Sequence, residues 1–125
     1  MKYNEITRRY FESAPCAGIL SGQGALRGSA GSREQGTWVQ FDLKVEAVPR
    51  STARTISATR FLCYGCPHTI AISAWVAEQA LGRELLRELP EDVRRLSARF
   101  ELPPEKLGRL LIIEDAWARA VASAD

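Results

Sequence analysis

The sequence changes from a strand-like to a helix-like pattern across one short stretch, Arg60-Phe61-Leu62-Cys63-Tyr64-Gly65-Cys66-Pro67-His68. Before it, apolar and polar residues alternate, as in strands with one buried face; after it, apolar residues recur at helical spacing. Proline suits the first position of a helix, and Gly65 permits a tight reversal just before Pro67. The stretch is therefore predicted to join the last strand of a sheet to a central helix.

Upstream of this junction the sequence predicts one helix and three strands. The clearest alternation covers residues 38–46, and residues 53–62 follow after a turn short enough to favour antiparallel pairing. A weaker strand is predicted within the glycine-rich residues 18–36, where Ile19-Leu20 is one of two apolar pairs. The helical spacing of apolar residues in residues 2–12 predicts a short N-terminal helix.

Downstream of the junction every apolar segment has helical spacing. Residues 69–81 are apolar or small nearly all round, which predicts a helix buried on several sides. A short amphipathic turn over residues 85–89, a helix that starts at about residues 90–92 and leads to residue 100, and a last helix from about residue 105 to 122 complete the pattern. Residues 1–125 are thus expected to form a single α+β domain, in which an N-terminal helix and a helical C-terminal half pack on a three-stranded antiparallel sheet.

The composition narrows the possible functions. The chain has 125 residues, 46% of them hydrophobic, and a net charge of +2 from 17 basic and 15 acidic side chains. A domain of this length can bury a core without disulfides, so the cysteines are available for chemistry. The weak charge argues against a nucleic-acid partner, and no apolar stretch approaches the roughly 20 residues of a membrane-spanning helix. Because no secretory leader is recognised, a cytoplasmic protein is expected. In that reducing compartment a Cys-x-x-Cys pair indicates metal binding or redox chemistry rather than a structural disulfide.

The junction concentrates the reactive side chains, since it holds two of the three cysteines and the only histidine. Cys66 is expected at the N-cap of the central helix, where free N–H groups and the helix dipole favour a thiolate that can accept sulfur or bind metal. Plainer roles stand beside this interpretation. Cys63 shares a strand face with Phe61 and can simply pack there. His68 can cap a helix or lie in solvent, and Cys16, in a separate loop, can be incidental.

Several motifs resemble one known family. Arg60-Phe61 followed by Tyr64-Gly65-Cys66 resembles the middle of the NifU/IscU-type iron–sulfur cluster assembly scaffold proteins. The segment Leu102-Pro103-Pro104-Glu105-Lys106 resembles that family's Leu-Pro-Pro-Val-Lys element, and Glu114-Asp115-Ala116 resembles its Glu-Asp-Ala helix. The resemblance covers nearly the whole chain, and its order of elements agrees with the prediction made from the residues.

The resemblance implies a cluster ligand at one position of this sequence, whereas other ligand positions of the family carry different residues here. The family builds a [2Fe–2S] cluster on three cysteines, with an aspartate and a histidine nearby, using sulfur from a cysteine desulfurase. Cys66 matches the family's Tyr-Gly-Cys ligand, which implies the roles of sulfur acceptor and cluster ligand. The family's Ala-Cys-Gly-Asp segment corresponds to Glu34-Gln35-Gly36-Thr37, and its His-Cys pair corresponds to Gly108-Arg109. Gln35, Thr37, Gly108 and Arg109 therefore stand at ligand positions of the family.

Three hypotheses follow from this pattern. The first is a scaffold-like binding protein, rather than an enzyme, that holds iron, a [2Fe–2S] cluster or zinc through a rebuilt site of Cys66, Cys63, His68 and Cys16. The second is a cluster-free interaction partner of the assembly machinery, offering one thiol or none. The third is a thiol–disulfide oxidoreductase using Cys63 and Cys66.

The resemblance also implies partners. They are a cysteine desulfurase and a cluster-transfer chaperone that reads the proline-rich segment, here represented by Leu102, Pro103, Pro104 and Lys106. The plain alternative for this segment is a loop before a helix.

Overall fold

Three antiparallel strands form the sheet, in the spatial order β1 (Leu26–Ser32), β2 (Thr37–Ala47) and β3 (Arg54–Tyr64). The computed structural model describes residues 3–124. Val39, Phe41 and Leu43 of β2 point to one side and are fully buried, as the alternation of apolar and polar residues requires. The predicted antiparallel sheet of three strands is therefore confirmed.

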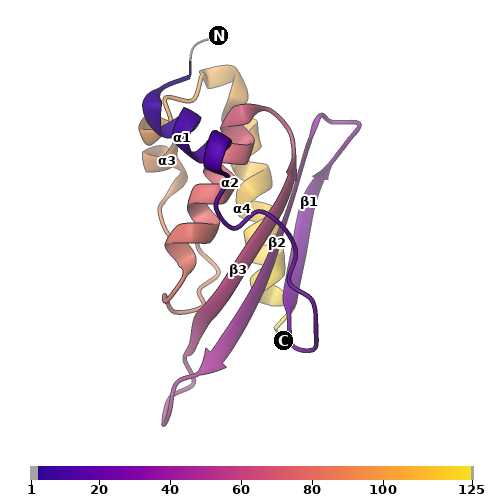
Figure 1. Ribbon diagram of the computed structural model, residues 1–125, viewed down its shortest axis with the longest axis vertical. Helices are drawn as coiled ribbons and strands as arrows, with labels where there is room; N and C mark the ends of the chain where they lie inside the picture. Colours follow the sequence, from indigo (N-terminus) through magenta and orange to yellow (C-terminus); the bar gives the residue numbers. More distant parts are fainter. Residues whose placement is uncertain (1–2, 125) are drawn as a thin grey trace.

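Helices make up the rest of the fold (Figure 1). α1 (Glu5–Ser13) packs on α2 (Pro67–Ala80), and α2 packs on β3. After α3 (Val93–Arg99), α4 (Leu107–Ala122) runs behind the strands and packs on β1 and β2 (Figure 1). The predicted α+β arrangement, with an N-terminal helix and a helical C-terminal half, is confirmed.

Some predicted elements and boundaries were wrong, and two of the differences have a tertiary reason. Residues 85–89 form no helical turn, because the backbone there bonds to the start of β3: the Leu85 N–H donates to the Arg54 carbonyl at 2.7 Å. Ile19-Leu20 lies outside β1, and the chain just before it pairs with β3 through a parallel bridge between Ala17 and Phe61. The last helix begins at Leu107, after a 3₁₀ turn, η1 (Pro104–Lys106).

The N-terminal helix is shorter than expected. It begins at Glu5 because Asn4 caps it, accepting a hydrogen bond from the Thr7 N–H at 3.0 Å. Of the predicted range 2–12, residue 2 lies outside the described residues, and Tyr3 precedes the cap. Among the helices of residues 3–124, none is long and apolar enough to cross a membrane.

Candidate functional site

Three segments that are distant in the sequence meet around the start of α2. Gly36, in the turn between β1 and β2, lines a cavity of about 350 Å³ together with Cys63 and Gly65 of the β3–α2 junction. From η1, the Lys106 Nζ atom lies 3.8 Å from the Cys66 Sγ atom. The turn before β2 and the junction each contain a ligand position of the family, and η1 directly precedes the third such segment, Gly108-Arg109. The fold therefore brings these parts of the chain near the junction, although Cys66 is the one family ligand retained in them.

Cys66 occupies the N-cap of α2, as predicted. Its backbone is extended (φ −78°, ψ 167°) and its carbonyl accepts the hydrogen bond from the Ile70 N–H at 3.1 Å, because Pro67 begins the helix. The thiol makes no side-chain cap hydrogen bond; instead Sγ lies 3.5 Å from the Thr69 hydroxyl. Half-burial opposes ionisation, but the Thr69 hydroxyl, the first N–H groups of α2 and the Lys106 charge together lower the pKa of Cys66.

Cys63 has the opposite electrostatic character. Burial raises the pKa of its thiol to about 12, and the neighbouring charge of Cys66 adds to the increase. Its side chain is partly buried and packs against the core, on the strand face that it shares with Phe61. A protonated thiol is neither a good nucleophile nor a metal ligand. Of the two junction cysteines, Cys66 therefore ionises more readily and is the better nucleophile.

His68 is buried and already bonded. Only 2% of the residue is exposed, and its Nδ1 atom lies 3.1 Å from Nζ of Lys106, which is itself only 8% exposed. Because a lysine ammonium has donors only, Nδ1 accepts this bond and the neutral ring carries its proton on Nε2. Burial, followed by the charges of Lys106 and Arg109, lowers the pKa of His68. Neither the cap nor the solvent position considered for His68 is observed.

Cys16 is not brought to the other reactive groups. The Sγ atom of Cys16 lies 3.5 Å from the Thr59 hydroxyl, and the Cys16 carbonyl accepts the Phe61 N–H at 2.9 Å. Thr59 precedes Cys63 by four positions on β3, which corresponds to about 13 Å along a strand. Within residues 3–124, no three histidine, cysteine, aspartate or glutamate side chains form a group that could hold a metal ion. The residues present do not fit a [2Fe–2S] cluster, which takes four ligands.

Lys106 and Thr69 are the site residues that the sequence reasoning missed. Lys106 belongs to the proline-rich segment, so its motif pointed to a partner rather than to Cys66. In the structure, Leu102 and Lys106 are buried at the two ends of that segment, and Pro104 between them is exposed. Thr69 lies three positions after Cys66, which places it on the same helix face. That spacing was the signal available in the sequence.

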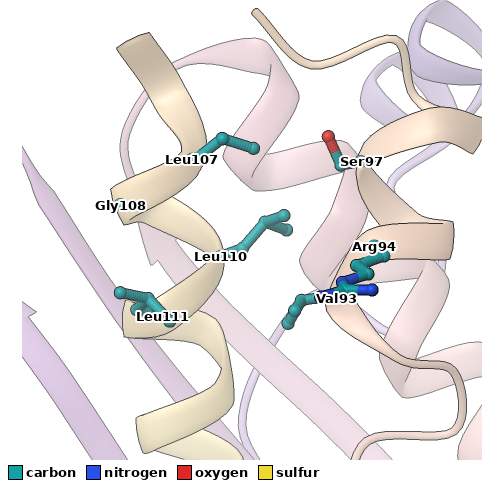
Figure 2. A pocket seen from close by; sticks show the side chains of 7 residues that line it. All are labelled: Val93, Arg94, Ser97, Leu107, Gly108, Leu110 and Leu111. Atoms are coloured by element: carbon teal, nitrogen blue, oxygen red, sulfur yellow. The ribbon is translucent and has the colours of Figure 1, made fainter. Parts of the chain in front are cut away.

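A second hollow lies away from Cys66, between α3 and α4 (Figure 2). Its volume is about 410 Å³ and its lining is mainly apolar. Leu110 points across it toward α3, while Leu107 and Leu111 of α4 are 44% and 57% exposed (Figure 2). Gly108, at a ligand position of the family, lies on the wall of this groove. The groove contains none of the chemically reactive side chains.

The fold, with these segments near the junction before α2, is the one found in iron–sulfur cluster assembly scaffold proteins, a class of scaffolds rather than enzymes. The chain belongs to the family described as the NifU-like N terminal domain, whose family model matches residues 2–123. No curated protein sequence matches the chain.

Solved structures with the same fold are distant in sequence. A putative iron–sulfur cluster assembly scaffold protein for the SUF system from Fervidobacterium islandicum AW-1 superposes with a TM-score of 0.66 at 12% identity, covering 95% of this chain and 96% of that one. A nitrogen-fixing NifU-like protein (N-terminal) from Brucella abortus gives a TM-score of 0.68 at 14% identity, with 97% and 92% covered. At such identities the likeness establishes the fold alone.

Proposed function

We propose that this chain works in iron–sulfur cluster assembly through one thiol, Cys66, which accepts sulfur from a cysteine desulfurase. The observation that carries the proposal is the placement of Cys66 Sγ at the N-cap of α2, 3.8 Å from the Lys106 ammonium. In the step proposed, the Cys66 thiolate attacks the outer sulfur of the desulfurase persulfide. The persulfide S–S bond breaks, the desulfurase thiolate leaves, and a persulfide remains on Cys66.

A resident metal or cluster on this chain has less support. Iron, zinc or a [2Fe–2S] cluster held by Cys66, Cys63, His68 and Cys16 would need a deprotonated Cys63 and a ring nitrogen of His68 with a free lone pair. Lys106 bonds Nδ1 of His68, which leaves the ring proton on Nε2, and the Lys106 charge beside Cys66 repels a metal cation. Cys16 would also have to leave its contact with Thr59. A cluster assembled at Cys66 therefore requires ligands from beyond residues 3–124.

The oxidoreductase hypothesis is disfavoured by the order of the two thiols. In oxidoreductases with a Cys-x-x-Cys motif, the attacking thiolate is the first cysteine, at the start of the helix. Here the first cysteine, Cys63, has the raised pKa, and the second, Cys66, begins the helix. The described chain after α2 also returns to no strand of the sheet, unlike a thioredoxin-like fold.

Anaerobic incubation with a cysteine desulfurase, free cysteine and ferrous iron tests the proposal. Mass spectrometry is expected to find one added sulfur on Cys66, absent in Cys66→Ser and retained in Cys63→Ser and Cys16→Ser. The isolated chain is expected to give no visible absorption of a [2Fe–2S] cluster.

Two results would contradict this expectation. If an active desulfurase leaves Cys66 unmodified, the cluster-free interaction partner without sulfur chemistry becomes the better hypothesis. If the isolated chain binds a stable cluster that is lost in Cys63→Ser, His68→Ala or Cys16→Ser, the rebuilt ligand site is correct.

A further inference from the structure

Both helices that pack on the sheet, α2 and α4, lie on the same side of it. They cover the face on which Phe41 of β2 is fully buried. Because side chains alternate along a strand, Trp38 and Gln40 of β2 point to the opposite face. Tyr64 and Leu62 of β3 lie in register with these two residues and share that face.

The end of this second face nearest the junction is apolar and exposed. Tyr64 is 49% exposed and Leu62 is 37% exposed. Trp38 beside them is partly exposed, and its neighbour in register on β1 is Gly31, which has no side chain to cover the indole. We call Trp38, Leu62 and Tyr64 the open patch. A contiguous group of large apolar side chains on a surface is typical of a contact site for another molecule.

The charges next to the open patch are positive. The Arg33 guanidinium, from the turn between β1 and β2, lies 5.5 Å from the centre of the Tyr64 ring, and Arg60 of β3 lies on the same face. Neither arginine forms a salt bridge within residues 3–124. Asp42, which is in register with Arg60, is 1% exposed and bonds Arg27 at 2.8 Å, so its charge is neutralised. A surface that presents carboxylates would complement this arrangement.

The position of the open patch indicates which kind of molecule covers it. Tyr64 precedes Cys66 by two residues and also lines the cavity beside the junction. A protein that delivers sulfur to Cys66 must bring its persulfide within bonding distance of Sγ, so it also covers the surface nearby. A second copy of this chain fits poorly, because it would bring the same positive charges together. The net charge of +2 does not favour a nucleic acid.

We propose that the open patch is the docking surface for the protein that donates sulfur to Cys66, and that this donor presents carboxylates beside an apolar side chain. The inference rests on the proposed function of Cys66 as a sulfur acceptor and adds where its donor binds. Trp38 and Tyr64 supply the apolar contact, while Arg33 and Arg60 pair with the donor's carboxylates. Tryptophan, tyrosine and arginine are the residue types that dominate binding energy in protein interfaces.

Loading of Cys66 at increasing concentrations of a cysteine desulfurase tests the docking surface. In Tyr64→Ser the half-saturating desulfurase concentration is expected to rise roughly tenfold, because an aromatic contact is lost. Leu62→Ser should act in the same direction with a smaller effect. The effect falls on this concentration rather than on the maximal rate, because docking precedes transfer. Phe11→Ser is the matched control, since it removes a 41% exposed aromatic ring from α1 and should leave loading unchanged.

Two measurements separate docking from other effects of these substitutions. Circular dichroism confirms that each variant is folded. Iodoacetamide should alkylate Cys66 at the same rate in Tyr64→Ser, Leu62→Ser and the wild-type chain, because the reagent needs no docking. A loss of loading matched by an equal loss of alkylation would show that the substituted residue acts on the thiol, and would overturn the docking role.

Charge reversal tests the electrostatic part of the proposal. Arg33→Glu should raise the half-saturating desulfurase concentration roughly tenfold at low ionic strength and much less at about 1 M salt, where surface charges are screened. Arg87→Glu makes the same change of charge in the exposed segment between α2 and α3, and is the matched control. Equal effects of Arg33→Glu and Arg87→Glu, or an effect that persists at high salt, would refute the role of charge.

Direct binding separates this inference from the proposed function. Biolayer interferometry of the desulfurase on Cys66→Ser reports docking without transfer, and adding Tyr64→Ser should weaken that binding. If the desulfurase loads wild-type Cys66 and the patch variants equally, the docking surface is wrong and the proposed function stands. If it binds through the open patch but loads no sulfur, the docking surface stands and the proposed function is wrong. The absence of both binding and loading would overturn both.

Two further results would replace the protein donor as the occupant of the open patch. One is binding of a single-stranded oligonucleotide that Tyr64→Ser abolishes. The other is a dimer in size-exclusion chromatography that the same substitution dissociates. Either result would overturn the inference, because the open patch would then serve a nucleic acid or a second copy of the chain.

Discussion

Cys63 and Cys66 are three positions apart, yet the structure shifts their pKa values in opposite directions. Cys63 ends a strand and is partly buried against the core, where the charged form of a thiol is disfavoured. Cys66 begins a helix, where burial is outweighed by the Thr69 hydroxyl, the first N–H groups and the Lys106 charge. The immediate surroundings of each residue therefore decide which of the two cysteine side chains is reactive.

Alkylation as a function of pH checks this difference. The pKa of Cys66 is lowered, so its reaction with iodoacetamide should reach its plateau at a lower pH than that of an ordinary thiol. The pKa of Cys63 is about 12, so it should stay largely unmodified in the folded chain over that range. Peptide mapping after a short exposure at about pH 8 separates the two sites. Faster labelling of Cys63 than of Cys66 would contradict the structure, and Cys66→Ser serves as the control.

At the scale of elements, the contact between β1 and α4 decides how closely the C-terminal helix lies on the sheet. Gly28 of β1 faces the backbone of α4, and a Cβ built on it would lie 2.0 Å from the Ala120 nitrogen. Gly28 also pairs in register with Phe41, whose ring is fully buried. The Arg119 guanidinium donates to the Ser29 carbonyl at 2.9 Å, so α4 also covers the outer edge of β1. The absence of a side chain at Gly28 permits this approach.

Gly28→Ala is therefore expected to destabilise the fold. The added methyl group meets backbone rather than a movable side chain, so the free energy of unfolding should fall by about 1–3 kcal/mol or more. Gly108→Ala is the matched control, because a Cβ at Gly108 meets no atom within 4 Å and alanine favours the helix. It should leave stability unchanged or raise it by up to about 1 kcal/mol. Urea unfolding of both variants measures the difference, and equal stabilities would show that α4 does not approach β1 this closely.

At the scale of the whole molecule, Trp117 connects three parts of the fold. Its ring is 1% exposed and meets Phe41 of the sheet edge-on, with centroids 5.4 Å apart. Its indole N–H donates to the Leu86 carbonyl at 3.0 Å, which ties the irregular segment between α2 and α3 to α4. The segment that the sequence predicts as an amphipathic turn is thus held by one core side chain and by its hydrogen bonds to β3.

Trp117→Ala should remove both connections and leave a cavity in the core. The expected loss in the free energy of unfolding is about 3–5 kcal/mol, which is typical of large aromatic residues replaced in a core. Leu111→Ala, in the same helix but 57% exposed, should cost no more than about 0.5 kcal/mol. Thermal unfolding followed by circular dichroism compares the two. Similar effects of the two substitutions would mean that Trp117 is not the central packing residue.

The sequence by itself determined the α+β class, the strand of residues 38–46, the helix after Pro67 and the N-cap position of Cys66. These features depend on alternation, helical spacing and the geometry of proline, which act between neighbours in the chain. The family resemblance followed for the same reason, because its motifs are short and local. Ile19-Leu20 shows the limit of this reasoning, since the path of residues 16–18 along β3 depends on hydrogen bonds to Phe61, many positions away.

Only the tertiary structure decided what surrounds Cys66. Lys106 is 40 residues away in the sequence and reaches the thiol because η1 leads into α4 beside the start of α2. Cys16, which sequence reasoning grouped with Cys66, lies at Thr59 instead, because the loop after α1 pairs with the middle of β3. Reactivity and ligand sets depend on charge, burial and distance between segments, and local sequence patterns do not specify these quantities.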